Sequence, residues 1–319
     1  MKKSFTLAFA IVLSFSLQIP LKAQSQKSED WTYVHEGDTI FGTQIIVENS
    51  PGVVLIVAGS GPTDRDGNNP MNLKTDAYKK LAEALAAMGW SSVRYDKRGI
   101  AASSSAVKNE SDMLPSYYVR DIAGILFQLS ADYNQMVLIG HSEGALLAGE
   151  ALAKYDLSYP FISLEGPGRS LDVTLKEQLK TKLNSELYAM AAAKIDSIKE
   201  GQTVYDQHFI WMSLFRKSVQ PYMAELFSMD PCTIYSQLNG LVYIVDGGHD
   251  IQITEAERTQ LKECLPNAEF VTMPKMTHVL VDSENPNDTQ VYNQPELPLS
   301  SDLIKALDTI LNQQIHSGK

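Results

Sequence analysis

One serine lies in a pentapeptide that suits nucleophilic catalysis. The sequence reads GHSEG at positions 140–144, directly after the apolar segment Met136–Ile139 and before an Ala- and Leu-rich helical segment. In a strand–turn–helix context, G-x-S-x-G holds the serine in a strained turn that exposes its hydroxyl group. Glycines are needed on both sides because side chains there would collide with neighbouring backbone. The motif therefore predicts Ser142 as a nucleophile; the alternative is a chance pentapeptide at a tight turn.

A serine nucleophile needs a general base, and the sequence contains six histidines. His278 lies in the segment MTHVL (276–280), just after a predicted last strand over 269–272. Catalytic groups of open α/β sheets gather beyond the carboxyl ends of the strands. We therefore predict His278 as the base, with His249 as its rival.

The base in turn needs an acid that orients it. The segment VDGGHD (245–250) ends a predicted strand, Leu241–Val245, and offers Asp246 and Asp250. Asp250 lies beyond two glycines, on a loop that can reach across, so we favour Asp250 and keep Asp246 as the alternative. A loop or helix cap is the ordinary role of either residue.

The tetrahedral intermediate of acyl transfer needs two N–H groups that stabilise its oxyanion. The backbone of Glu143, next to the nucleophile, offers one of them. The other is expected from the loop AGSGP (58–62), with the N–H of Ser60 favoured and that of Gly61 second.

These residues require a scaffold, and the chain alternates strand-like with helix-like segments, as in a mostly parallel sheet with helices on its faces. The predicted strands are 52–58, 90–96, 136–139, 161–164, 241–245 and 269–272, and the predicted helices are 75–88, 117–129, 143–153, 255–264 and 303–311. The stretch between Gly166 and Gly240 has no strand pattern and shows leucines at four-residue spacing. We predict an inserted group of helices at about 166–236, placed as a cap over the serine.

Taken together, the motifs resemble the α/β-hydrolase superfamily, and in particular bacterial esterase-like members of the serine aminopeptidase (hydrolase-4) type. The matching segments are GSGPTDRDGN (59–68), YDKRG (95–99), GHSEG (140–144), GGHDIQI (247–253) and MTHVL (276–280). Ser142, Asp250 and His278 follow one another in the nucleophile–acid–histidine order of that fold. The resemblance implies the α/β-hydrolase fold, with a mostly parallel central sheet and an inserted helical cap, and it implies ester hydrolysis. The segment Ile100–Ala102 departs from it, because relatives usually place a glycine there.

Three functions remain open at this stage. The first is an exported serine hydrolase that cleaves small-molecule carboxylic esters with short to medium acyl groups and needs no cofactor. The second is a peptidase with the same triad, whose amine site would need cap carboxylates such as Glu177, Glu186 and Asp196. The third is a non-catalytic binding protein that keeps the fold. Aromatic residues of the cap are candidates for an acyl pocket or for ordinary core: Trp211, Phe215, Tyr222 and Phe227.

Composition and termini limit the partners and the location. The 319 residues carry a formal charge of −11, which is unsuited to nucleic acid or anionic lipid. Lys2 and Lys3 precede an apolar run over 5–21 that turns polar before Ala23. This pattern predicts a signal peptide over 1–23 and an exported, periplasmic or secreted hydrolase domain over 24–319, with a membrane anchor as the alternative. The sequence does not fix the oligomeric state.

Weaker signals concern metals and ion pairs. The segment DRDGN (64–68) looks like half of a calcium loop, but position twelve is Thr75 rather than glutamate, so a hydrogen-bonded turn is favoured. Arg65 is expected in a salt bridge rather than at the substrate, and an ion-pair role is expected for residues 96–98. Two cysteines, Cys232 and Cys264, are too few for a four-cysteine zinc site. They are expected either to pair or to be buried separately.

Overall fold

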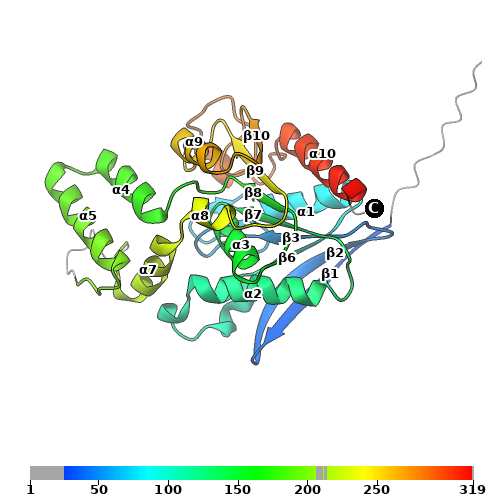
Figure 1. Ribbon diagram of the computed structural model, residues 1–319, viewed down its shortest axis with the longest axis horizontal. Helices are drawn as coiled ribbons and strands as arrows, with labels where there is room; N and C mark the ends of the chain where they lie inside the picture. Colours follow the sequence, from blue (N-terminus) through cyan, green and yellow to red (C-terminus); the bar gives the residue numbers. More distant parts are fainter. Residues whose placement is uncertain (1–24, 206–210, 212–213, 318–319) are drawn as a thin grey trace, which may run out of the picture.

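A computed structural model describes residues 25–205, 211 and 214–317, so the predicted signal peptide lies outside the described residues. Its centre is an eight-stranded sheet with the order β1-β2-β6-β3-β7-β8-β9-β10 (Figure 1). The strands are β1 (Gln26–His35), β2 (Asp38–Val47), β3 (Val53–Val57), β6 (Ser91–Tyr95), β7 (Met136–His141), β8 (Phe161–Leu164), β9 (Val242–Gly247) and β10 (Glu269–Met273). A separate small ribbon pairs β4 (Asn68–Asn69) with β5 (Leu73–Lys74).

Helices alternate with these strands along the chain. The α-helices are α1 (Ala77–Ala87), α2 (Pro115–Leu129), α3 (Glu143–Lys154), α4 (Leu171–Lys182), α5 (Ser185–Lys199), α7 (Gln220–Ser228), α8 (Pro231–Tyr235), α9 (Glu255–Cys264) and α10 (Ser301–Ser317). Short 3-10 helices are η1 (Ala101–Ala106), η2 (Glu110–Asp112), η3 (Lys217–Val219) and η4 (Gln290–Asn293). All predicted strands and helices are present, and their ends shift by a few residues, most at α10.

The strands from β6 to β10 are parallel, whereas β2 runs antiparallel to both of its neighbours. The continuous apolar run of β3 is buried at every position, as expected for a strand covered on both faces. Because parallel strands end at one edge of the sheet, the loops after β3, β7, β8 and β9 lie together there.

The hairpin of β1 and β2 was not predicted from the sequence. His35 ends β1, and the two-residue turn Glu36–Gly37 has positive φ values of 52° and 89°. Trp31 and Tyr33 join the core that faces α2, while most other β1 side chains are exposed. The strand β1 therefore lacks the continuous apolar run by which a strand such as β3 is recognised.

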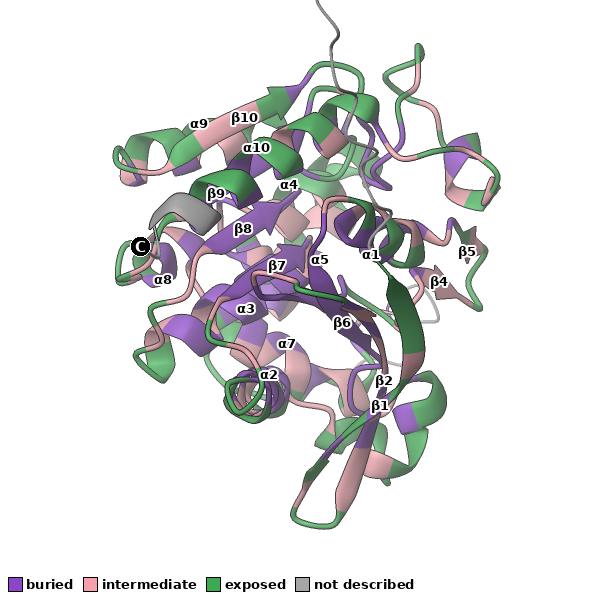
Figure 2. Cartoon of the chain, turned by 90° about the vertical axis from the view of Figure 1, so that its right-hand side faces the viewer, coloured by how far each residue is buried: buried purple, intermediate pink, exposed green. Residues whose placement is uncertain are grey.

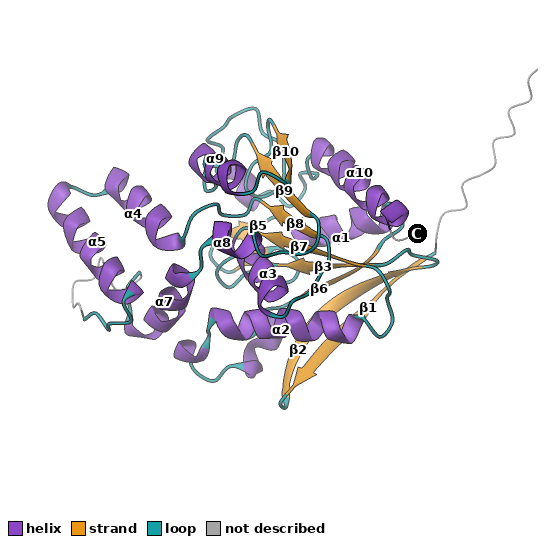
Figure 3. Cartoon of the chain, in the orientation of Figure 1, coloured by secondary structure: helices purple, strands orange, loops and turns teal. Residues whose placement is uncertain are grey.

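Two hydrophobic cores flank the sheet (Figures 2 and 3). One is formed with α2, α3 and α8, and the other with α1 and α10. The fold class is therefore the predicted one, a mostly parallel sheet between helical layers.

The inserted helices α4, α5 and α7 form a third apolar cluster of their own and project away from the sheet (Figure 1). Trp211, Phe215 and Phe227 are buried in this cluster, so they serve as core, whereas Tyr222 faces the functional site. The ends of α4 and α7 border the serine, while α5 lies farther out. The cap limits of about 166–236 stay a prediction.

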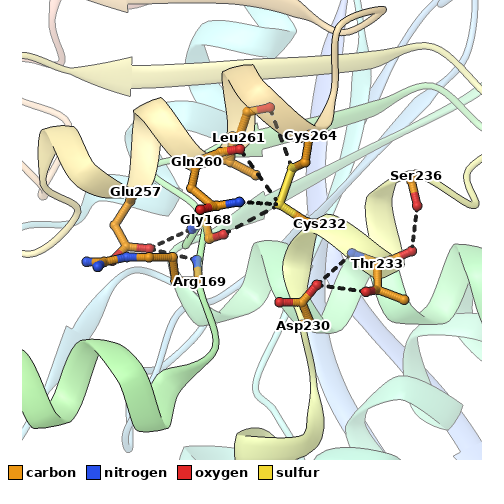
Figure 4. The surroundings of a disulfide bond; sticks show 10 residues. All are labelled: Gly168, Arg169, Asp230, Cys232, Thr233, Ser236, Glu257, Gln260, Leu261 and Cys264. Atoms are coloured by element: carbon orange, nitrogen blue, oxygen red, sulfur yellow. Dashed lines mark hydrogen bonds and ion pairs between the residues drawn. A yellow bond between two sulfur atoms is a disulfide. The ribbon is translucent and has the colours of Figure 1, made fainter.

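A disulfide joins Cys232 on α8 to Cys264 on α9 (Figure 4). It ties the segment that follows the inserted helices to the helix that follows β9. The sequence left open whether the two cysteines pair or are buried separately, and in the structure they pair. Within residues 25–205, 211 and 214–317, no helix has the length and hydrophobicity needed to cross a membrane.

Candidate active site

Ser142 lies at the junction of β7 and α3 in an unusual backbone conformation, with φ 54° and ψ −127°. The flanking glycines explain how the turn is possible. A Cβ atom at Gly140 would lie 2.4 Å from the carbonyl oxygen of Gly144, and one at Gly144 would lie 2.4 Å from that of Val57. The turn is therefore packed directly against the backbone of β3, and Ser142 is held where the sheet ends.

His278 and Asp250 form a buried pair beside this turn. The Nδ1 atom of His278 lies 2.6 Å from Oδ2 of Asp250. The other carboxylate oxygen, Oδ1, accepts hydrogen bonds from the backbone N–H groups of Gln252 (2.6 Å) and Ile253 (2.9 Å). Burial raises the pKa of Asp250, but the His278 charge and hydrogen bonds from His278, Glu165 and the Ile253 N–H outweigh it and hold the pKa at about 2. The carboxylate is thus ionised and fixed, and His278 lines the same cavity as Ser142.

The two rivals are engaged elsewhere. The Nδ1 atom of His249 lies 2.8 Å from the carbonyl oxygen of Ser283. Asp246 is buried near Arg258, with 3.7 Å between its Oδ1 and the Nε atom of that arginine. The geometry therefore brings together the favoured members of each pair, His278 and Asp250.

A second buried carboxyl, not anticipated from the sequence, lies next to Asp250. Glu165 directly follows β8 and has a positive φ of 49°. It is fully buried, and burial followed by the Asp250 charge raises the pKa of Glu165 well above its usual value. Its surroundings therefore favour the neutral form of Glu165 beside Asp250. Its place at a strand end is the signal that reasoning from the sequence overlooked.

The proposed oxyanion donors are the N–H groups of Ser60, on the loop after β3, and of Glu143, at the start of α3. Both segments contact the buried side chain of Lys97. Lys97, at the end of β6, donates a hydrogen bond to the carbonyl oxygen of Gly59, and its Nζ atom lies 3.9 Å from Oε1 of Glu143. Tyr222 of α7 donates to the same Glu143 oxygen at 2.5 Å. Glu143 begins α3, and its backbone N–H has no intrahelical acceptor at that position. Lys97 thus fixes the loop of Ser60 relative to the start of α3.

His141 takes part in a buried chain of hydrogen bonds. Its Nε2 atom lies 2.8 Å from the carbonyl oxygen of His278, which can only accept, so Nε2 carries the proton. Its Nδ1 atom therefore accepts from the hydroxyl of Tyr78 at 2.8 Å, and Tyr78 accepts from the N–H of Gly59 at 2.9 Å. Burial lowers the pKa of His141 to about 3, which keeps the ring neutral. The chain links the loop of Ser60 to the loop of His278.

The Asp64–Asn68 segment forms the favoured hydrogen-bonded turn. Oδ1 of Asp64 accepts from the backbone N–H groups of Asp66 and Asn68, both at 2.9 Å. Arg65 pairs with Asp96, with 2.7 Å between Nη2 and Oδ2, as the salt-bridge alternative predicted. Among the described residues, no group of three or more His, Cys, Asp or Glu side chains is arranged to hold a metal ion.

Arg98 is also in ion pairs, as expected for this strand end. It binds the buried Asp121, with 2.9 Å between Nε and Oδ2, and it also binds Asp38. These contacts connect the loop after β6 to α2 and to the β1–β2 hairpin.

The chain resembles known proteins over part of its sequence. Residues 71–200 match the family model described as serine aminopeptidase, S33, which includes Ser142 but neither Asp250 nor His278. The esterase EstD of Thermotoga maritima is 24% identical over 254 residues, which is 75% of this chain and 57% of EstD. The chain thus spans little more than half the length of this relative.

Solved structures of similar fold cover nearly the whole chain. The Pyrococcus furiosus esterase Pf2001 has a TM-score of 0.55 at 16% identity and covers 91% of each chain. Est1E from Butyrivibrio proteoclasticus with bound ferulic acid has a TM-score of 0.58 at 14% identity, over 90% of this chain and 99% of Est1E. The chain therefore has the α/β-hydrolase fold and, over residues 71–200, resembles the serine aminopeptidase S33 family.

Proposed function

We propose that the protein is a serine hydrolase that cleaves carboxylic esters with short to medium acyl groups through an acyl-enzyme on Ser142. The observation that carries this proposal is the buried His278–Asp250 pair, which borders the same cavity as a serine held in a strained strand–helix turn. Relatives described as esterases support it.

In the proposed reaction, Ser142 attacks the acyl carbonyl while Nε2 of His278 takes the hydroxyl proton. Asp250 holds the Nδ1 proton and stabilises the imidazolium that forms. The backbone N–H groups of Glu143 and Ser60 stabilise the oxyanion of the tetrahedral intermediate. His278 then gives its proton to the leaving alkoxide, and water repeats the sequence on the acyl-enzyme.

The charges around the serine favour an ester over a peptide with a free amino group. Binding an ammonium group would need an unpaired carboxylate. Two of the candidate carboxylates are already in ion pairs, Glu177 with Arg169 (2.7 Å) and Asp196 with Lys176. Glu186 is exposed on α5, away from the end of the sheet. The Glu143 carboxylate accepts a hydrogen bond from Tyr222 and pairs with Lys97.

Export of the mature chain is part of the proposal. A signal peptide over 1–23 would deliver the protein to the periplasm or the medium, and disulfides such as Cys232–Cys264 form in oxidising compartments. Edman sequencing of protein recovered from the exported fraction should begin at Gln24. A chain that retains Met1 and stays with the membrane would support the anchor instead.

The function is tested by hydrolysis of p-nitrophenyl acetate, butyrate and octanoate beside aminoacyl p-nitroanilides. The wild type should cleave the esters and label with a fluorophosphonate, and Ser142→Ala should lose at least about 10³-fold in kcat and all labelling. Faster cleavage of the anilides would establish a peptidase. Absence of both labelling and turnover would favour a non-catalytic binding protein.

A further inference from the structure

We propose, on the basis of the esterase function above, that the site separates a small acyl pocket from a larger, uncharged pocket for the alcohol that carries several polar side chains. The substrate class that fits is a short-chain ester, such as an acetate, of a neutral alcohol that carries several hydroxyl groups. The inference rests on two cavities that meet at Ser142.

The two cavities both border the nucleophile and differ in the other catalytic groups that line them. One, of about 540 Å³, is bordered by Ser142 and His278. The other, of about 200 Å³, is bordered by Ser142 and Glu143 but not by His278. Ser60 borders both, as a donor at the carbonyl oxygen would.

The chemistry assigns a role to each cavity. His278 must reach the oxygen of the departing alcohol to protonate it, within about 3 Å at the moment of transfer. The alcohol therefore lies on the His278 side, in the larger cavity. The remaining substituent of the carbonyl carbon, the acyl group, then extends into the smaller one.

The acyl cavity is small, and its lining contains both apolar side chains and an ion pair. Leu146, Leu171 and Leu226 line it. Arg169, which also lines it, binds the fully buried Glu257, with 2.6 Å between Nη2 and Oε1. A cavity of about 150 Å³ holds one benzene molecule, so 200 Å³ suits acyl groups of a few carbons.

The alcohol cavity is uncharged and combines polar side chains with apolar ones such as Met71, Leu73 and Val279. None of the described residues that border it is Asp, Glu, Lys or Arg. Its neutral polar side chains are Thr63, Asn69, Asn72, Gln252, Thr289 and Tyr292. Amide and hydroxyl groups can both donate and accept, which matches the hydroxyl groups of a sugar or polyol. A carboxylate, phosphate or ammonium group would find no opposite charge there.

A third cavity offers the competing substrate class. It measures about 690 Å³, is largely lined by apolar residues such as Ile100, Val107 and Met113, and adjoins the alcohol cavity at Gly61 and Met71. It contains neither Ser142 nor His278. An ester of a long apolar alcohol would need to extend past Met71 to fill it.

The test compares alcohols and acyl groups separately, in the wild type and in two matched variants. A pH-stat measures kcat/KM for methyl 6-O-acetyl-glucopyranoside and hexyl acetate, and absorbance measures it for p-nitrophenyl acetate and butyrate. Thr289→Trp narrows the alcohol cavity, and Gln178→Trp narrows the acyl cavity. Both positions are exposed and lie outside the catalytic groups.

The wild type should prefer the sugar acetate to hexyl acetate by about tenfold or more. Thr289→Trp should lower kcat/KM for the sugar acetate by about tenfold and leave the acetate-to-butyrate ratio unchanged. Gln178→Trp should lower kcat/KM for p-nitrophenyl butyrate relative to p-nitrophenyl acetate. It should leave the ratio of kcat/KM between the sugar acetate and hexyl acetate unchanged. A preference for hexyl acetate, or effects of the two variants in the opposite assignment, would overturn the proposal. Loss of Ser142-dependent cleavage of p-nitrophenyl acetate would instead refute the esterase function itself.

Discussion

Replacing Asp250 with asparagine should reverse the position of the proton on His278. In the wild type, Oδ1 of Asp250 accepts from two backbone N–H groups and Oδ2 accepts from Nδ1–H of His278. In the variant, the amide oxygen must stay with the two backbone donors, because an NH2 group there would face them. The amide nitrogen then donates to Nδ1, and the imidazole carries its proton on Nε2, where it cannot take one from Ser142.

The size of the effect follows from the buried pair. The pKa of Asp250 falls from 3.8 to about 2 although burial opposes the change, a preference for the ionised form of about 2 kcal/mol. Losing the charge should cost the imidazolium a similar amount. Breaking the new hydrogen bond to restore the productive tautomer adds about 1–3 kcal/mol. The sum, about 3–5 kcal/mol, corresponds to a loss of about 10²- to 10⁴-fold in kcat.

The assay is steady-state hydrolysis of p-nitrophenyl acetate at pH 8, with Asp246→Asn as the matched control. Asp246 lies in the same segment, and its replacement by asparagine is the same chemical change. Its side chain lies near Arg258 rather than His278. Asp246→Asn should stay within about fivefold of the wild type in kcat. Circular dichroism should show both variants folded. An Asp250→Asn variant that is folded and within tenfold of the wild type would refute the assigned role, as would an equal loss in Asp246→Asn.

Two further predictions concern stability. Burial, and then the His278 charge, lower the pKa of His141 from 6.5 to about 3. Between these two pH values the unfolded state binds a proton that the folded state does not. The free energy of unfolding therefore falls by about 1.4 kcal/mol per pH unit as the pH drops from 6.5 toward 3. The His141→Gln variant should lack this part of the pH dependence in urea unfolding between pH 6.5 and pH 4, and parallel curves for the two proteins would contradict it. The disulfide closes a loop with a sequence separation of 32, so replacing both Cys232 and Cys264 with serine should lower the free energy of unfolding by about 3–4 kcal/mol. Thermal unfolding of the variant beside dithiothreitol-treated wild type checks this, and an unchanged melting temperature would be incompatible with a cross-linked native state.

Elements with a strong hydrophobic pattern could be predicted from the sequence. Elements that are held by contacts with distant parts of the chain could not. The buried run of β3 and the spacing of α1 identified those elements within two residues. The β1–β2 hairpin was missed because Trp31 and Tyr33 are buried by contact with a distant helix rather than by a local apolar pattern. The Glu36–Gly37 turn was its clearest local signal.

The candidate site shows the same division. Ser142, Asp250 and His278 stand out because each has a motif or follows a predicted strand. Lys97 and Tyr78 do not, because their roles depend on contacts with Gly59, which is 38 residues from Lys97 and 19 from Tyr78 along the chain. Such contacts arise only when the loops at the end of the sheet come together.

The backbone of Ser142 has a consequence for selection. A non-glycine residue at φ 54° and ψ −127° costs of order 1–3 kcal/mol, and glycine would relieve most of that strain. A lineage that used this fold only to hold a ligand would gain stability from such a replacement and would lose nothing by it. Natural proteins lie close to their stability threshold, so an unused strain of this size is open to removal by a single substitution. A serine at this position is therefore most readily understood as a residue maintained for its hydroxyl group.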